Sequence, residues 1–169
     1  MFKTGDLVVY GGNGVCRIES VAPLPGTDQE YYTLRPLFTE CVIRVPVTTK
    51  VAMRDVISRG EAMRLIDSIP NIVAEAYHNR SATLLAEHYD MAFRSHNCED
   101  LIDLTMSIYT KKKIAEREKR KFGMVDERYM KRAEELLFGE LSVALGIPVA
   151  DVQSFISKRI DTLKEENGQ

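Results

Sequence analysis

Short apolar runs alternate with polar residues through the first part of the chain. This pattern predicts strands over residues 7–10, 15–21, 31–34 and 41–47, and a short fifth strand over 51–53. Gly11-Gly12-Asn13-Gly14 separates the first two strands, and we expect a hairpin turn there because glycine adopts positive φ at little cost. Five short strands in so few residues are typical of a small SH3- or Tudor-like barrel and too few for a two-layer sandwich.

Pro46 ends the fourth predicted strand and indicates where that strand lies in the sheet. Proline has no backbone N–H to donate to a neighbouring strand, so it is found mainly on edge strands. We therefore expect residues 43–46 to lie at or near an edge. An exposed edge is either protected against association or used to bind a strand of a partner protein.

From Arg54 onward the apolar positions follow the spacing of helices instead. The predicted helices cover residues 58–69, 71–78, 81–95, 98 onward, 126–146 and 147–163. Asn71, Asn97 and Asp126 are the expected N-caps of the second, fourth and fifth of these helices. The predicted fold class is therefore α+β in two domains. Residues 1–54 form a small five-stranded Tudor/SH3-like β-barrel, and residues 55–169 form an all-α domain of five or six helices.

The helical spacing also predicts which side chains form the core of the second domain. The apolar side of the helix over 81–95 is formed by Leu84, Leu85, His88, Met91 and Ala92, and His88 is expected to be a partly buried packing residue. The core face of the helix over 126–146 is formed by Met130, Ala133, Leu136, Leu137, Leu141 and Ala144.

The formal net charge of −2 at pH 7, from 23 Lys+Arg and 25 Asp+Glu, does not by itself indicate a nucleic-acid-binding protein. The distribution is uneven, however, because residues 111–121, here called the basic segment, contain a concentrated run of cations. They are Lys111, Lys112, Lys113, Arg117, Lys119, Arg120 and Lys121. At 100° per residue these side chains spread around a helix, as in a solvated helix that projects beyond the core. Solvation and contact with DNA phosphates are compatible, so the residues leave both interpretations open.

The sequence offers little catalytic chemistry. Cys16, Cys41 and Cys98 form no C-x-x-C pair and are expected to be small buried apolar residues in a reducing compartment. The histidines lack the spacing of a zinc site, and no nucleophile motif such as G-x-S-x-G occurs. No apolar run approaches the roughly 18–20 residues that cross a bilayer. We therefore expect a cytoplasmic binding protein that is not an enzyme, needs no cofactor or metal, has no small-molecule substrate and contacts no membrane.

Several motifs resemble those of a known family. They are Phe2-Lys3-Thr4-Gly5-Asp6-Leu7-Val8-Val9-Tyr10, Tyr32-Thr33-Leu34, Ile43-Arg44-Val45-Pro46-Val47 and Arg54-Asp55-Val56-Ile57. These residues closely resemble the N-terminal module of the CarD/CdnL family of bacterial transcription regulators, which is itself similar to the RNA-polymerase-interacting module of the transcription-repair coupling factor. The helical half is similar to the C-terminal domain of the same family at residues 97–101 and 133–141.

The resemblance implies a transcription regulator that binds the lobe of the RNA polymerase β subunit and places its helical domain against promoter DNA. Helping open promoter complexes persist is typical of the family. The match assigns polymerase contact to Arg44 and, more loosely, to Ile43, Val45 and Pro46. This assignment agrees with the edge position expected from Pro46, where backbone pairing supplies affinity and an arginine supplies selectivity.

The chain departs from the family at one position. Many members carry a tryptophan wedge for the minor groove, whereas the equivalent stretch here, residues 82–87, has none. We therefore assign a sequence-independent DNA contact to Arg80 and to the cations of the basic segment, which Arg128, Lys131 and Arg132 could extend. An adaptor of a different class remains open, with the same barrel edge and a helical domain that binds another protein instead of DNA.

Overall fold

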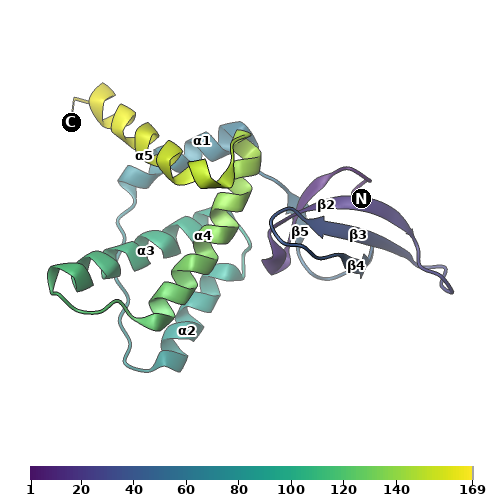
Figure 1. Ribbon diagram of the computed structural model, residues 1–169, viewed down its shortest axis with the longest axis horizontal. Helices are drawn as coiled ribbons and strands as arrows, with labels where there is room; N and C mark the ends of the chain where they lie inside the picture. Colours follow the sequence, from purple (N-terminus) through teal and green to yellow (C-terminus); the bar gives the residue numbers. More distant parts are fainter. Residues whose placement is uncertain (169) are drawn as a thin grey trace. The chain divides into compact units, whose positions relative to one another are not determined.

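A computed structural model describes residues 1–168 of the chain, in which five strands precede five α-helices (Figure 1). The two-domain α+β organisation is therefore confirmed. The chain divides into two compact units, Met1–Ile57 and a unit that begins at Ser58. The division lies beyond the position after residue 54 that the sequence suggested, because the last strand continues to Asp55. We call the two parts the sheet unit and the helical unit.

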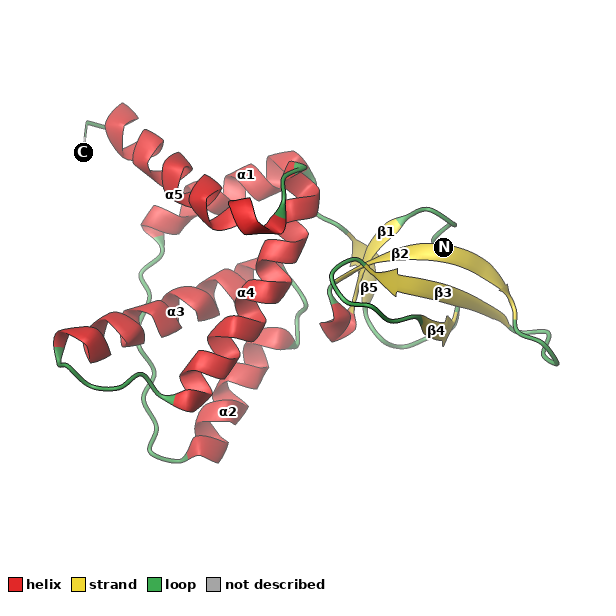
Figure 2. Ribbon diagram, in the orientation of Figure 1, coloured by secondary structure: helices red, strands yellow, loops and turns green. Residues whose placement is uncertain are grey.

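The sheet unit is one antiparallel sheet with the strand order β4-β3-β2-β1-β5. Its strands are β1 (Leu7–Tyr10), β2 (Val15–Pro23), β3 (Glu30–Pro36), β4 (Ile43–Pro46) and β5 (Met53–Asp55). Figure 2 shows β2 and β3 as the long strands of this sheet. A short 3-10 turn, Gly11–Asn13, joins β1 to β2, and Gly11 and Gly14 have φ of 46° and 73°, as expected of a glycine-rich turn.

The core of the sheet unit follows the two-residue alternation of its strands. Its buried side chains are Val8, Tyr10, Cys16, Ile18, Tyr32, Leu34 and Val45. Alternate residues of a strand point to one face, so these positions from four strands meet on the same side of the sheet. Burial of this kind, with the nearby Cys41 thiol, raises the pKa of Cys16 to about 11. Cys16 and Cys98 are buried as expected, but the prediction was wrong for Cys41, which is exposed in the connection between β3 and β4.

The α-helices of the helical unit are α1 (Arg59–Ser68), α2 (Ala82–Asp90), α3 (Cys98–Arg117), α4 (Met124–Leu145) and α5 (Val149–Glu166). Short 3-10 turns extend α1 at Ile69–Asn71 and α2 at Met91–Phe93. The expected N-cap at Asn97 is confirmed, because its side-chain oxygen accepts from the Asp100 N–H at 2.9 Å. Gly146 ends α4 in the left-handed conformation, with φ of 69°.

The helix predicted over residues 71–78 was wrong, because this stretch forms an irregular connection to α2. Ile72, directly after the 3-10 turn, is already extended, with φ of −75° and ψ of 122°. Tertiary contacts hold the connection. The Glu75 carbonyl accepts from the Ser107 hydroxyl at 2.6 Å, and the Tyr77 ring stacks on His88 at a centroid distance of 3.6 Å. These contacts outweigh a helix propensity that is weak over so few residues.

Asp126 was also predicted wrongly, since α4 starts earlier, with Gly123 as its N-cap and no side-chain cap bond there. Asp126 lies within the first turn, where its carboxylate turns inward and is buried. A carboxylate near a helix start is favourable at either position, so the residue type alone did not distinguish them.

α4 packs against the other four helices of the unit. Ala133, Leu137 and Leu141 are buried on its core face, whereas the predicted core residue Leu136 is only half-buried. The predicted face of α2 is confirmed for Leu85, which is buried, and wrong for Leu84 and His88, which are exposed. Tyr89, which the prediction did not include, is also buried. His88 packs against the stacked Tyr77 ring and is not part of the core of the helical unit.

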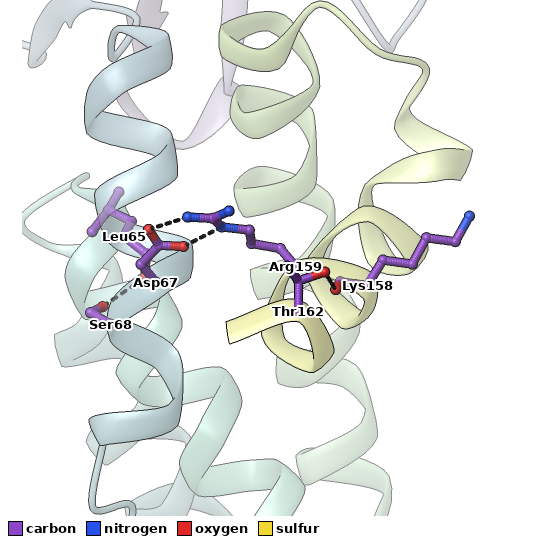
Figure 3. Close-up of polar contacts among 6 residues, drawn as sticks. All are labelled: Leu65, Asp67, Ser68, Lys158, Arg159 and Thr162. Atoms are coloured by element: carbon purple, nitrogen blue, oxygen red, sulfur yellow. Dashed lines mark hydrogen bonds and ion pairs between the residues drawn. The ribbon is translucent and has the colours of Figure 1, made fainter. Parts of the chain in front are cut away.

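A half-buried ion pair joins α1 to α5 (Figure 3). The Arg159 guanidinium donates to both carboxylate oxygens of Asp67, at 2.8 and 3.0 Å, and Figure 3 shows the two side chains reaching across the gap between the helices. The hydrogen bond and charge of Arg159 hold the pKa of Asp67 below its usual value. Among residues 1–168, no helix has the length and apolar composition needed to cross a membrane.

Candidate functional site

The structure confirms that β4 is an edge strand, as Pro46 indicated, because β4 is the first strand in the sheet order and pairs with β3. Along this ladder Ile43 lies opposite Leu34, and Arg44 lies opposite Thr33. The other side of β4 is the side on which a further strand would add to the sheet.

The ladder fixes which backbone groups of β4 point outward. The Val47 N–H donates to the Glu30 carbonyl at 3.1 Å, and bonded pairs recur at every second residue of an antiparallel ladder. Ile43 and Val45 therefore face β3 with their backbone groups. Arg44 and Pro46 occupy the alternate positions, where the N–H and C=O point away from β3. Pro46 thus stands at a position where its missing N–H removes no bond to β3.

The side chains of β4 alternate in the same way. Val45 is buried in the core, and Ile43 is half-buried against that core. Arg44 is exposed, and Pro46 is half-buried. Of the four residues that the resemblance associated with polymerase, only Arg44 thus combines an exposed side chain with outward backbone groups.

Two apolar side chains beside β4 did not stand out in the sequence. Phe38 is 53% exposed and Val42 is 41% exposed, and both lie in the connection between β3 and β4. Large exposed apolar residues next to an open strand edge are the usual components of a protein-binding surface. The connection also contains Leu37 and Cys41, so its apolar residues in the sequence do not separate exposed side chains from core ones.

The basic segment does not have a single conformation. Its first four cations, Lys111, Lys112, Lys113 and Arg117, lie on α3, and the helix ends directly after them. Lys119 has a φ of 55°, which is unusual for a residue other than glycine, and the Arg120 N–H bonds back to the Ala115 carbonyl at 2.8 Å. The interpretation of the basic segment as a helix therefore holds for residues 111–117 and is wrong for residues 118–121. The last three cations lie in the turn that leads to α4.

Lys111 is part of the interior of the helical unit. Its ammonium donates to Asp126 Oδ1 at 3.0 Å, and the two side chains are only 14% and 5% exposed. The Tyr89 hydroxyl donates to the same carboxylate oxygen at 2.5 Å. Burial, with this bond to Asp126, raises the pKa of Tyr89. One carboxylate thus joins α2, α3 and the start of α4, and the charge of Lys111 is used inside the domain.

The remaining cations of the basic segment differ in availability. Arg120 pairs with Glu118 at 2.6 Å, and the Lys112 ammonium lies 5.8 Å from the centre of the Phe122 ring. Four more are exposed and form no hydrogen bond or ion pair within residues 1–168. They are Lys113, Arg117, Lys119 and Lys121. These four side chains carry the positive charge that the segment offers to solvent.

Other cations of the helical unit lie on different elements. Arg80 is exposed in the connection that leads into α2. On α4, Arg128 lies 5.3 Å from the centre of the Tyr129 ring, and Arg132 lies 4.9 Å from that of Phe93. Stacking on an aromatic ring fixes a guanidinium while leaving its N–H groups able to bind an anion.

A comparison with protein families gives a match over residues 2–57, to the CarD-like/TRCF RID domain. The match covers the sheet unit, including β4 and its connection to β3. A comparison with curated proteins found no match to the chain.

Proposed function

We propose that the protein is a transcription regulator which binds the RNA polymerase β subunit through residues 2–57, the part of the chain that matches the CarD-like/TRCF RID domain. In this proposal the helical unit contacts promoter DNA and the bound protein stabilises the open promoter complex. The protein binds both partners without a catalytic step.

The open edge of β4 carries the polymerase part of the proposal. A strand of the β subunit adds to β4 through the outward backbone groups of Arg44, so that the sheet continues into the partner. The Arg44 guanidinium then selects the partner through an acidic group. Phe38 and Val42 add apolar contact beside the strand, which backbone pairing alone does not provide.

The exposed cations of the basic segment support the DNA part. Lys113, Arg117, Lys119 and Lys121 contact phosphates and not base edges, because flexible lysine and arginine side chains near a turn form no fixed pattern of donors. Such binding is weak alone and falls steeply with salt. Attachment to polymerase raises the local concentration of the helical unit at the promoter, which makes a weak contact effective.

The structure also favours one alternative, in which the protein is a polymerase-bound adaptor without direct DNA contact. Lys111 and Arg120 pair with acidic side chains of the helical unit, so the segment offers less charge than its sequence suggests. In that case the helical unit binds another protein.

The lifetime of open promoter complexes tests the proposal. We expect the wild-type protein to slow the dissociation of polymerase from a promoter after addition of a competitor. A variant with Lys113, Arg117, Lys119 and Lys121 all changed to Gln is expected to bind polymerase normally and to lose most of this effect. If that variant slows dissociation as well as the wild type does, the adaptor is the better description. If the wild type has no effect on lifetime, stabilisation of the open complex is wrong.

A further inference from the structure

The helical unit contains a groove between α3 and α5, and of its lining residues only Lys113 takes part in the proposed DNA contact. It encloses about 310 Å³, at the lower end of the range typical of small-ligand pockets. We propose that this groove binds a small amphiphile with an apolar chain and an anionic head group, such as a carboxylate. The proposal does not depend on polymerase or DNA binding.

Two helices supply the walls of the groove with regularly spaced side chains. On α3 the lining residues include Ile102, Met106 and Tyr109, which recur at three- and four-residue intervals and so form one stripe. On α5 the equivalent stripe includes Ile156 and Ile160. Leu137 and Phe138 of α4, against which both helices pack, also line the groove. Most of its surface is therefore apolar and only partly covered by the domain itself.

Among residues 1–168, the one charged side chain that lines the groove lies at one end, whereas the hydroxyls of Thr105 and Ser157 lie among the aliphatic side chains. The Gln153 amide donates to the Tyr109 hydroxyl at 3.4 Å, which places the start of α5 beside the second half of α3. Lys113 follows one turn beyond Tyr109 and also lines the groove. In the opposite direction along α3, the lining residue is Ile102. An elongated ligand therefore meets a cation at one end and aliphatic side chains at the other.

The groups around Lys113 do not neutralise its charge within residues 1–168. The Tyr109 hydroxyl donates to Glu134 at 3.0 Å, and burial with this bond raises the pKa of Tyr109 to about 12, so the phenol is neutral at physiological pH. Glu134 accepts this bond without lining the groove. The Lys113 ammonium forms no ion pair within residues 1–168. An anionic head group supplies the partner that Lys113 lacks, and a neutral or cationic head group does not.

The shape of the space agrees with a single flexible chain. A helix of a partner protein is about 10–12 Å across, so it could place only isolated side chains in a space of this size. An alkyl chain can instead lie along the stripes of α3 and α5 and remove their apolar surface from water over its whole length.

Titration calorimetry with decanoate, kept below the concentration at which it forms micelles, tests the proposal on the full-length protein. We expect saturable binding of one decanoate per chain. Lys113→Gln should weaken decanoate binding at least tenfold, but should leave the binding of the uncharged methyl ester of decanoate almost unchanged. Ser157→Phe, which places a ring in the groove, should abolish binding of both compounds.

Lys158→Gln is the matched control, because Lys158 neighbours Ser157 on α5 but does not line the groove, and Figure 3 shows its side chain extended away from α1. It should bind decanoate as the wild type does, and the melting temperature of each variant reports whether it is folded. The proposal is wrong if the wild type does not bind decanoate. It is also wrong if folded Ser157→Phe binds it normally, or if Lys113→Gln and Lys158→Gln weaken binding equally.

Discussion

The sheet unit and the helical unit present their candidate binding surfaces in different ways. At β4 the position along the strand determines whether a side chain is accessible to a partner, because the alternation that buries Val45 exposes Arg44. In the basic segment, whether a cation is accessible depends on acidic residues that lie far from it in the sequence. Lys111 and Lys113 are two residues apart on the same helix, yet one is held by a buried carboxylate and the other has no ion pair within residues 1–168.

The accessibility of a charged side chain can therefore be predicted from neighbouring residues at a strand edge, but not on a helix. A strand edge is defined by backbone geometry, which a period of two residues expresses directly. A cation on a helix can instead reach an acid on any neighbouring helix, so a cluster of lysines overstates the charge that a ligand meets. The predictions below test this contrast between the edge of β4 and the helical unit, in order of decreasing effect.

Leu141→Ala should have the largest effect, because Leu141 is fully buried on the core face of α4. Removing its side chain leaves a cavity where α4 packs against other helices, and should lower the free energy of unfolding by about 2–5 kcal/mol. Chemical denaturation followed by circular dichroism measures the change. Leu136→Ala, at a half-buried position on the same helix, is the control and should cost clearly less. Equal losses would mean that the core face of α4 is assigned wrongly.

Asp126→Ala should destabilise the helical unit by about 3 kcal/mol, because it leaves the Lys111 ammonium and the Tyr89 hydroxyl without their acceptor in a buried site. The same denaturation experiment measures this loss. Asp151→Ala replaces an exposed acid in the first turn of α5 and should change stability little. A stability equal to wild type for Asp126→Ala would show that Lys111 is not held internally and is available to a ligand.

Single neutralisations should separate the exposed cations from the internal one in DNA binding. Lys121→Gln should reduce the slope of log affinity against log salt by about 0.9, because one fewer phosphate counterion is released. Lys111→Gln should lower the melting temperature without changing this slope. Fluorescence anisotropy of a labelled duplex at several salt concentrations measures both slopes. Equal slopes for the wild type and Lys121→Gln would show that Lys121 does not contact a DNA phosphate.

The smallest effect is expected at the half-buried pair of Asp67 and Arg159, whose side chains are about a third accessible. Because Arg159 holds the pKa of Asp67 below its usual value, the pair contributes stability above the usual aspartate pKa of about 3.9, and this contribution is lost as pH falls below it. Asp67→Asn should lower the melting temperature by about 1–3 °C at pH 7 and match the wild type in strong acid. A difference that persists unchanged in acid would contradict this account.

Much of the sheet unit could be predicted from the sequence because its signals are local. The glycines at 11 and 14 mark the turn, the apolar alternation marks the strands, and Pro46 marks the edge. The outward position of Arg44 follows from the same alternation. The exposure of Phe38 and Val42 could not be predicted, since it depends on what the rest of the unit leaves uncovered.

Two of the errors in the helical unit share one physical cause, which is competition from tertiary contacts. The stretch before α2 is held by the bond from Ser107 to the Glu75 carbonyl and by the Tyr77 stack on His88, not by its own helix propensity. Asp126 likewise serves a buried ion pair instead of a cap. Neither the acceptor of a buried lysine nor the partner of an exposed ring is encoded near it in the chain.

Binding of the purified β-subunit lobe of RNA polymerase tests the central claim most directly, with Arg44→Glu as the test variant and Arg17→Glu as its control. Arg17 is an exposed arginine on the inner strand β2, so its reversal makes the same charge change away from the open edge. The account predicts that Arg44→Glu weakens binding at least about tenfold, while Arg17→Glu binds like the wild type and both variants keep a native circular dichroism spectrum. Equal binding by wild type and Arg44→Glu would contradict docking through the edge of β4.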